Sequence, residues 1–476
     1  MEERGNFGSK LGIIFATAGS AVGLGNIWRF PTEAGNNGGG AFLLVYILCV
    51  VLMGVPLMVA EFAVGRHSRA NTGSAFRILS KRRSWGLLGK MEVLAAFLIL
   101  AYYSVVAGWT LYYAFQSLLN RFNVMARQGD SSVFADNFNS FVSDPWLPLL
   151  CLAAFLFATH FVVVRGVKSG IERSSKILMP FLFLLMVVLV VCALTTPGAA
   201  KDPSEDCVVM MTMHAAKGLE FFFTPDFSKI DSGVVMSAMA QAFYSLSLGM
   251  GCMCTYASYF KRDANITKTA FTVGLMDMSV AVMAGIVIFP AVFSVPGLEP
   301  DAGPSLVFIA LPNVFQMAMG GIPAMAYVCS LAFYVLLVVA TLTSTISLHE
   351  VVTAYLSETR NMPRRRAAWY VTGGSLVLGI FCSLSLGVLS GMTVAGMTIF
   401  DLFDYVTAKI MLLAAGLLTS VFVGWVLKPH ALANELTNWG TLKLRCFSVL
   451  VFMLRYVVPL IIAGVFLDGL GLLNIL

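Results

Sequence analysis

Long apolar segments recur along the whole chain, and short polar connections separate them. Eleven segments are long enough to cross a bilayer as helices: 11–36, 41–64, 91–119, 147–164, 177–195, 234–259, 269–295, 323–357, 367–390, 396–427 and 447–475. A soluble fold of 476 residues could not bury a composition that is 58% hydrophobic and only 12% charged. We therefore predict an all-α membrane protein with about eleven transmembrane helices. This excludes a secreted domain, a nucleic-acid-binding protein and an ordinary cytosolic enzyme.

Basic residues are concentrated in alternate connections between these segments. Seven Lys and Arg side chains lie between residues 66 and 90, four between 165 and 176, and four between 360 and 366. The other connections are acidic or mixed and contain Asp130, Asp136, Asp144, Glu299 and Asp301. Because basic loops stay in the cytoplasm, the N-terminus is predicted to be cytoplasmic.

Two further features carry no function in this interpretation. The nine cysteines lie mostly within apolar runs and lack zinc-ligand spacing, so they are expected to be buried, unreactive thiols. Residues 201–216 are bracketed by a repeated Ala-Ala-Lys and are interpreted as an insertion in an outer loop. The stretch 208–221 resembles a helicase motif, but the chain has no G-x-x-x-x-G-K-[ST] phosphate loop to accompany it.

Glycine-rich interruptions lie in the middle of two predicted spans. The segment 19–26 contains three glycines, and SLSLGMG (245–251) repeats the defect five helices later. Glycine destabilises a helix, although small residues can also serve close helix packing. The spacing favours two inverted repeats, 11–195 and 234–427, followed by an extra helix at 447–475. Exposed amides attract a carboxylate and freed carbonyls attract cations, so we predict a cation-coupled transporter of a small anionic or zwitterionic solute.

Several motifs around these interruptions resemble those of the neurotransmitter:sodium symporters. They are SAVGLGNIWRFP (20–31), NGGGAF (37–42), GVPLMVAEFAVGR (54–66), SLSLGMG (245–251) and TYASYF (255–260). The likeness is nearest to the bacterial hydrophobic amino acid transporters. It implies one transporter domain over 1–476, with a leucine-transporter-like 5+5 inverted-repeat fold and broken helices 1 and 6. It also implies a multi-pass protein of the bacterial inner membrane, monomeric or weakly dimeric.

The resemblance implies two sodium ions. The first site would use the side chains or carbonyls of Ala21, Asn26, Ser245 and Asp277, and the second those of Gly19, Val22, Ala340, Thr343 and Ser344. Oxygen ligands suit a hard cation. Read alone, TLTSTIS (341–347) is only a hydroxyl-rich helix that satisfies its own carbonyls.

Asp277 departs from the family pattern, which often has Asn at this position. Chloride-dependent relatives supply a negative charge with an anion, and many bacterial members use a Glu where this chain has Ala281. The chloride-pocket residues Tyr46 and Gln241 are present. Our hypothesis is that Asp277 supplies the charge and that chloride is not required; the alternative is a protonated Asp277 without an ionic role.

The resemblance also implies a substrate site. The amides of Leu24 and Gly25 and the Tyr103 hydroxyl would hold a carboxylate. The remaining expected contacts are Ser20, Tyr244 and Ser247 near the amino group, and Ile99, Tyr244, Met250 and Leu348 around the side chain. Monoamine carriers have an Asp where this chain has Gly23, so the substrate is expected to bring its own carboxylate. We predict a hydrophobic or aromatic amino acid.

Two gates follow from the same matching. Arg29 would pair with Asp404 through water on the outside, and Tyr103 and Tyr244 would cap the site. On the inside, Arg4 would pair with Glu358, supported by Tyr259 and Ser258, with Phe7 replacing the family's usual Trp. The alternative for the outer pair is two interfacial charges at helix ends.

Two other polar features lie inside predicted spans. Glu61 is costly to bury without a partner, and we expect it to hydrogen-bond to backbone near a helix break. The adjacent His349 and Glu350 are interpreted as satisfied structural residues rather than a proton relay.

The predicted function is sodium-coupled amino acid import by alternating access, without enzymatic chemistry. The main alternative is an amino acid sensor of the same fold that does not transport. A leaky channel and a membrane-embedded enzyme are further alternatives, but convergent acid, His or Ser side chains at one depth are not evident in the sequence.

Overall fold

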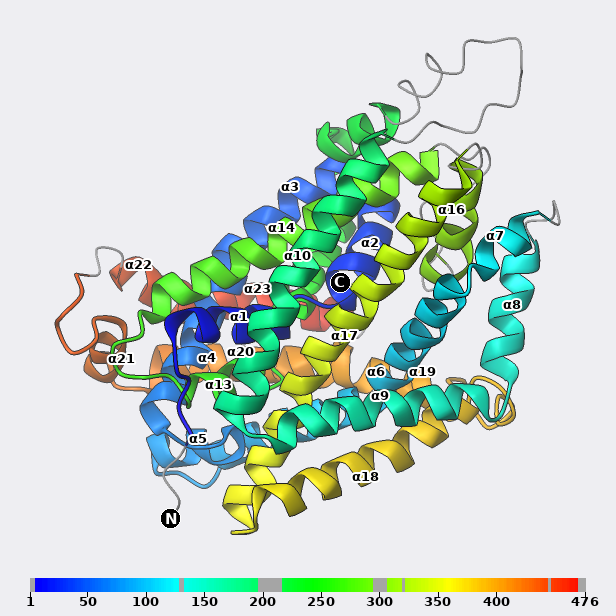
Figure 1. The fold of residues 1–476 in the computed structure, drawn as a ribbon. Coiled ribbons are helices and arrows are strands. Elements are labelled where there is room, and N and C mark those ends of the chain that lie inside the picture. The colour runs from blue at the N-terminus through cyan, green and yellow to red at the C-terminus, as the bar shows by residue number, and fades with distance from the viewer. Residues whose placement is uncertain are drawn as a thin grey trace.

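Helices make up the architecture of the computed structural model, which describes residues 5–127, 132–195, 216–293, 306–318, 322–443 and 447–469 (Figure 1). No strand occurs in these ranges, apart from two isolated bridges. Most of the predicted insertion, 201–215, lies outside the described residues, as does Arg4.

Nine helices of the described chain are long and apolar enough to cross a membrane, or ten if the bent first pair counts as one span. Five are uninterrupted: α6 (Trp85–Leu118), α9 (Leu147–Val164), α14 (Ile266–Phe293), α17 (Pro323–Thr359) and α18 (Arg364–Leu384). The predicted span 234–259 is divided into α12 (Ser232–Ser245) and α13 (Cys252–Ala257), each too short to cross alone. This division explains why eleven predicted segments yield fewer continuous helices.

The other four spans contain π-helical turns. They are α3 (Gly40–Cys49), η2 (Val50–Gly54) and α4 (Val55–Ser68); η3 (Val167–Glu172) and α10 (Arg173–Thr195); α19 (Ile399–Asp404), η6 (Tyr405–Met411), α20 (Leu412–Val421) and η7 (Phe422–Val426); and α22 (Phe447–Phe452), η8 (Met453–Val457) and α23 (Val458–Gly469). Connecting helices are α5 (Thr72–Ser80), α7 (Arg121–Ala126), α8 (Ser132–Ser143), η4 (Phe227–Lys229), η5 (Leu306–Ala310), α16 (Leu311–Ala318) and α21 (Pro429–Leu436).

Three predicted boundaries are wrong by several residues, one of them the start of the third span, which begins at Trp85 rather than at 91. The fifth span begins at Val167 rather than at 177, because the helix extends through charged residues that lowered the apolar score. The ninth ends at Leu384 rather than at 390, because turns occupy the following residues.

The first span bends in its middle. Helix α1 (Lys10–Ala21) begins at an N-cap where Ser9 Oγ accepts a hydrogen bond from the Gly12 amide at 3.0 Å. It ends where Val22 turns to an extended conformation, and the chain resumes as η1 (Gly25–Arg29) and α2 (Phe30–Asn36). The two halves differ in direction by 53°. The predicted break in helix 1 is confirmed.

The break between α12 and α13 is sharper. Ser247, Gly249 and Gly251 have φ angles of +54°, +75° and +73°, in the left-handed region that an L side chain rarely adopts. A Cβ on Gly249 would lie 2.4 Å from the Leu412 carbonyl oxygen, so this approach requires glycine. The predicted break in helix 6 is also confirmed.

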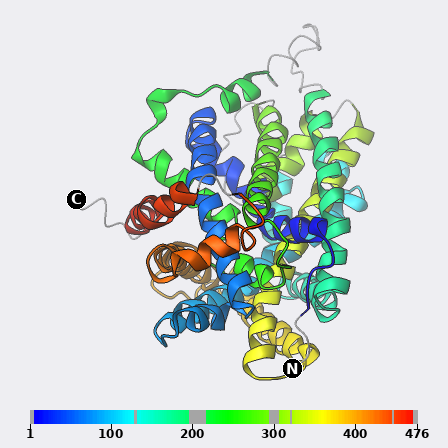
Figure 2. The same ribbon diagram turned by 90° about the vertical axis from the view of Figure 1, so that its left-hand side faces the viewer.

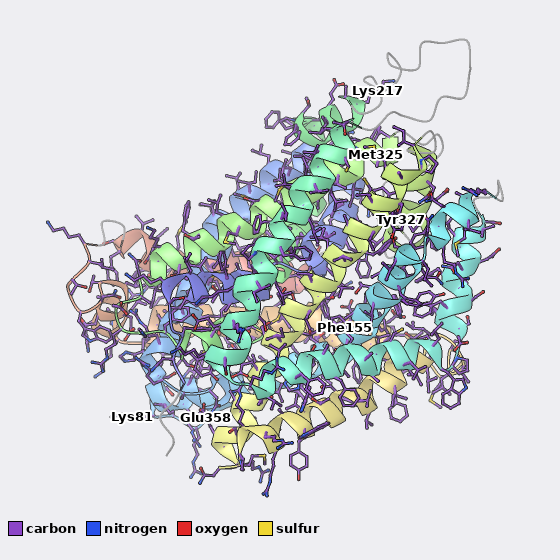
Figure 3. The ribbon with its side chains drawn as sticks, viewed as in Figure 1. Lys81, Phe155, Lys217, Met325, Tyr327 and Glu358 are labelled. Carbon is purple, nitrogen blue, oxygen red and sulfur yellow. The ribbon has the colours of Figure 1, made fainter. Side chains whose placement is uncertain are left out.

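The two broken spans lie among the uninterrupted ones. Helix α1 contacts α10, α14 and α17, while α13 packs against α4 and α17. Figure 2 shows the same bundle turned by 90°. Lys81 and Glu358 lie toward one end of the bundle and Lys217 and Met325 toward the other (Figure 3). The breaks in helices 1 and 6 are thereby placed within the protein rather than against lipid, since their residues are buried.

Candidate substrate and ion-binding site

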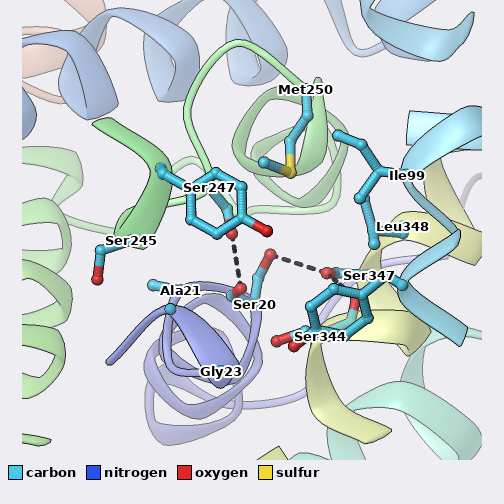
Figure 4. A pocket seen from close by; sticks show the side chains of 13 residues that line it. Ser20, Ala21, Gly23, Ile99, Ser245, Ser247, Met250, Ser344, Ser347 and Leu348 are labelled. Atoms are coloured by element: carbon cyan, nitrogen blue, oxygen red, sulfur yellow. Dashed lines mark hydrogen bonds between the residues drawn. The ribbon is translucent and has the colours of Figure 1, made fainter. Parts of the chain in front are cut away.

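A cavity lies where the two helix breaks meet α6 and α17 (Figure 4). The space between its lining atoms, including the part open to solvent, is about 380 Å³. Its lining residues are Ser20, Ala21, Gly23, Gly25, Ile99, Tyr103, Tyr244, Ser245, Ser247, Met250, Ser344, Ser347 and Leu348. All the predicted substrate residues except Leu24 are among them.

One side of this cavity is polar because hydroxyl groups from both breaks meet there. The Ser247 hydroxyl donates to the Ser20 carbonyl oxygen at 2.7 Å, and Ser20 Oγ donates to Ser347 Oγ at 2.8 Å. Figure 4 draws both bonds. The first bond also holds Ser247 in its left-handed backbone conformation. Sequence reasoning missed Ser347, although it lies one turn from Ser344 on the same hydroxyl-rich helix.

The opposite side is apolar, with Ile99, Met250 and Leu348 facing the cavity. The Leu24 amide donates to the Tyr103 hydroxyl oxygen at 3.2 Å. The two expected carboxylate ligands therefore contact each other in this structure, and Leu24 does not line the cavity. The Tyr103 hydroxyl retains its own proton to donate.

Three of the four residues predicted for the first sodium site, Asn26, Ser245 and Asp277, hydrogen-bond to one another, and the fourth, Ala21, lines the cavity with Ser245. Asn26 Nδ2 donates to Asp277 Oδ1 at 2.7 Å and to Ser245 Oγ at 2.9 Å. Ser245 Oγ donates to Asp277 Oδ2 at 2.9 Å. The Asn26 amide thus turns its nitrogen toward these groups, while its oxygen accepts from the Gly23 amide at 3.0 Å. A half-turn of this amide would present its oxygen to a cation at the same place.

Tyr46 and Gln241 support this cluster. The Tyr46 hydroxyl donates to Asp277 Oδ2 at 3.1 Å, and Gln241 Nε2 donates to the Gly25 carbonyl at 2.8 Å. Three donors thus point at one buried carboxyl, because Asn26 and Ser245 also contact Asp277. Ala281, one helical turn from Asp277, is buried and contributes no charge.

The residues predicted for the second sodium site also converge. Ser344 Oγ donates to the carbonyl oxygens of Val22 at 3.3 Å and Ala340 at 3.2 Å. Thr343 Oγ1 donates to the Ala340 carbonyl at 2.9 Å. A Cβ on Gly19 would lie 3.2 Å from the Thr343 side chain, so α1 and α17 approach closely here.

The two predicted sodium sites offer oxygen atoms as metal ligands, and each contains at most one carboxyl group. Groups of three or more His, Cys, Asp or Glu that could hold a metal do not occur among the described residues. Carbonyl, amide and hydroxyl oxygens with low total charge suit an alkali cation better than a transition metal. The donor sets therefore fit the predicted ion.

On the side of the cavity predicted to face outward, Arg29 has a partner that was not predicted from the sequence. Its Nε lies 3.7 Å from Glu33 Oε1, and its guanidinium lies 4.7 Å from the centre of the Tyr244 ring. Glu33 in turn accepts a hydrogen bond from the Ser237 hydroxyl at 2.6 Å. The described Arg29 and Asp404 form no direct ion pair within 4 Å, so their water-mediated pairing stays a prediction. The i, i+4 spacing of Arg29 and Glu33 was the signal that could have found this pair.

On the side predicted to face inward, Glu358 accepts a hydrogen bond from the Asn71 backbone amide at 3.0 Å and another from the Asn71 side chain at 2.8 Å. The expected partner of Glu358, Arg4, lies outside the described residues. The Tyr259 hydroxyl instead donates to Glu350 Oε1 at 2.7 Å. Arg364 Nη1 donates to the same oxygen at 2.9 Å and also contacts Glu350 Oε2. Sequence reasoning missed this arginine because it comes from another helix, α18.

The remaining polar features of the inner half are satisfied. His349 Nε2 lies 2.9 Å from the Thr372 hydroxyl and its Nδ1 lies 2.9 Å from that of Thr353, so His349 and Glu350 serve separate networks. Ser258 Oγ donates to a backbone carbonyl of its own turn. Phe7 is buried edge-on against the Tyr259 ring, with centroids 6.2 Å apart.

An ion-pair network lies at the C-terminal end of α4. Arg66 Nε donates to Glu435 Oε2 at 2.6 Å, and His67 Nδ1 lies 2.9 Å from Glu435 Oε1. Burial alone would raise the pKa of Glu435, but the hydrogen bonds from His67 and Arg66 outweigh it and hold that pKa below its ordinary value.

Comparisons with known proteins agree with this architecture. The model of the sodium:neurotransmitter symporter family matches residues 4–128 and 138–474. A Bacillus subtilis protein described as the uncharacterized sodium-dependent transporter YhdH is 36% identical, with 98% of each chain covered. An uncharacterized sodium-dependent transporter of Haemophilus influenzae is 33% identical over 98% of this chain and 99% of its own.

A solved structure is similar over the same length. The crystal structure of MhsT in complex with L-phenylalanine matches with a TM-score of 0.86 and 38% identity, covering 98% of this chain and 100% of MhsT. The all-helical fold with two broken helices, which the sequence predicted, is therefore that of a solved relative. The chain belongs to the sodium:neurotransmitter symporter family.

Proposed function

We propose that this protein imports hydrophobic or aromatic amino acids by sodium-coupled symport. The observation that carries the proposal is the cavity between the two helix breaks, with a hydroxyl-lined side and an apolar side, flanked by two clusters of oxygen donors. MhsT, 38% identical over nearly the whole chain, was crystallised with L-phenylalanine.

The substrate class follows from the chemistry of the cavity wall. Ile99, Met250 and Leu348 offer apolar surface to a side chain, and the flexible thioether of Met250 accommodates different shapes. Gly23 leaves the wall without an acidic group. A substrate without a carboxylate would therefore bring no negative charge to the first cation cluster, which favours an α-amino acid over a simple amine.

Sodium and amino acid would bind to the same broken segments. A cation beside Asn26 and Asp277 lies next to Gly25, whose amide region is expected to receive the substrate carboxylate. The second cation would join α1 to α17 through Val22 and Ser344. Each sodium ion entering with a favourable membrane potential contributes ~2.3 kcal/mol per 100 mV, which can drive uphill uptake.

Alternating access would open the cavity to each side in turn. In this proposal, residues 11–195 and 234–427 are the two inverted repeats, and helices 1, 2, 6 and 7 rock against the other spans. Arg29 and Asp404 would close the outer side over Tyr103 and Tyr244, while Arg4 and Glu358 would close the inner side. The N-terminus would be cytoplasmic in a bacterial inner membrane, with a monomer or weak homodimer as the unit.

The second candidate is a sensor that binds amino acids without transporting them. Purified protein in sealed liposomes separates the two functions. An inward sodium gradient should drive labelled L-phenylalanine uptake, and a panel of the standard amino acids in competition would rank substrates. Sodium-dependent binding without gradient-driven accumulation would favour the sensor, and neither activity would refute both.

A further inference from the structure

Two buried acids have no hydrogen bond to the cation clusters among those of the described chain, and the proposed mechanism does not use them. Glu61 on α4 and Glu92 on α6 are both 0% exposed. Glu61 Oε1 accepts a hydrogen bond from the Gly249 amide at 2.8 Å. The predicted backbone contact of Glu61 near a helix break is confirmed, and its position ties α4 to the unwound part of helix 6.

Glu92 has weaker support. Its Oε1 accepts a hydrogen bond from the Thr419 hydroxyl of α20 at 3.1 Å. In Glu92 and in Glu61, the other carboxyl oxygen, Oε2, is buried without a hydrogen-bond partner. Burying a carboxyl oxygen without a hydrogen-bond partner is costly, and the cost is greatest for an ionised carboxylate.

The charges around Glu61 and Glu92 indicate that the two acids are not both ionised. The two carboxyls interact electrostatically with each other, and the Cys252 thiol of α13 interacts with both. No Lys, Arg or His hydrogen bond or ion pair reaches either acid within the described ranges. The nearest arginine along α4, Arg66, is bonded to Glu435. Two buried carboxylates without a cation repel strongly, so at least one of them retains its proton.

The hydrogen bonds indicate which acid keeps it. Backbone amides stabilise an ionised carboxylate, and Glu61 faces the Gly249 amide and the amide of Cys254 near the start of α13. Glu92 has only a hydroxyl partner, which serves a neutral carboxyl as well. The proton therefore resides on Glu92 in the conformation described.

We propose that Glu61 and Glu92 form a proton-binding site, separate from the cation clusters, that holds one proton here and takes up a second when the helix 6 break moves away from Glu61. Once the Gly249 amide withdraws, an oxygen of Glu61 loses its donor. It then accepts a proton from hydronium, forming an O–H bond and releasing water. The site couples protonation to the position of helix 6, and this motion rests on the proposed function.

Infrared difference spectroscopy tests the resting state of the site. A protonated carboxyl has a C=O stretch that carboxylates lack. This band should be present in the full-length wild-type protein, lost in E92Q, and retained in E220Q, which changes an exposed glutamate. The T419V variant should shift the band because it removes the hydroxyl donor to Glu92. A spectrum unchanged in both E92Q and T419V would overturn the proposal, and T419V alone decides it if E92Q does not fold.

Proton counting tests the coupling. In weakly buffered solution with a pH indicator, replacing sodium by choline should release the helix 6 break and cause uptake of up to about one proton per protein. E61Q should abolish this uptake, while E220Q, which changes an exposed acid outside the proton-binding site and the cation clusters, should retain it. Equal uptake by E61Q and wild type would refute the coupling. If the infrared results hold but sodium-driven uptake of L-phenylalanine is absent, the proposed function fails and the proton site stands.

Discussion

Replacing Asp277 by Asn is the most direct test of the charge at the first cation cluster. The substitution keeps the size of the side chain and one oxygen, but it removes a negative charge that is wholly buried. The wild-type carboxyl accepts hydrogen bonds from Asn26, Ser245 and Tyr46 at 2.7 to 3.1 Å. Any cation in this cluster would lie within the same short distances.

The expected loss follows from Coulomb's law. Unit charges about 4 Å apart attract by about 4 kcal/mol at an effective dielectric constant of about 20. The three donors already share part of the carboxylate charge, and the new amide oxygen can still coordinate. We therefore expect sodium affinity to fall by about 1.4 to 4 kcal/mol, or roughly tenfold to roughly thousandfold.

The assay is binding of labelled L-phenylalanine to purified protein, with sodium titrated against choline in gluconate medium. The matched control is D136N, which makes the same change at an exposed acid on α8. In D277N, the hydrogen-bond donors Asn26, Ser245 and Tyr46 no longer face a negative charge. Added chloride can supply that charge, so it should restore part of the sodium affinity. Identical sodium curves for D277N and wild type would refute an ionic role for Asp277. Loss of wild-type binding in gluconate would refute chloride independence.

Three other substitutions have defined outcomes. G23A should abolish amino acid binding but not folding, since the added Cβ would lie 2.7 Å from Ser344 Oγ. Thermal melts in detergent measure folding and a binding assay measures the site, and intact amino acid binding by G23A would contradict the prediction. Y259F loses the 2.7 Å hydrogen bond to Glu350, so a cysteine probe on the inner side should react faster with a thiol reagent. Unchanged labelling of that cysteine would contradict a role of Tyr259 in closing the inner side. E435Q should destabilise the protein most near neutral pH, because the pKa of Glu435 is lowered in the folded state. Such an acid stabilises the fold at pH values above its unfolded pKa, and this stabilisation is lost as the pH falls through the folded pKa. A stability difference between E435Q and wild type that persists in acid would contradict this.

The breaks were predictable because they depend on local chemistry. Three glycines in eight residues weaken a helix wherever they occur, and SLSLGMG contains two of the positions that the structure turns left-handed, Gly249 and Gly251. Ser247 shares that conformation without being glycine. Its hydroxyl bond to Ser20, from the other break, holds it there, and no local pattern contains that partner.

The polar partners were harder to predict because they depend on packing between distant segments. Arg364 binds Glu350 from fourteen residues away across the α17–α18 turn, and Glu61 meets Gly249 from 188 residues away. The orientation of the Asn26 amide is also a tertiary property, since the Gly23 amide and Asp277 compete for its two ends. Residue types indicated which side chains were chemically competent, but not which of several acceptors each would choose.

Tight coupling between ion and substrate follows from how few residues the break in helix 1 contains. Within seven residues, Ser20 meets Ser247 and Ser347 at the cavity, the Val22 carbonyl accepts from Ser344, and Asn26 binds Asp277. A ligand shifts a conformational equilibrium only by its difference in affinity between the states. Since both cations and the amino acid would contact the same unwound backbone, ordering that backbone once lowers the cost for every later ligand. The coupling therefore requires no path through the rest of the bundle, and mutations that stiffen residues 19–26 should weaken the dependence of substrate affinity on sodium.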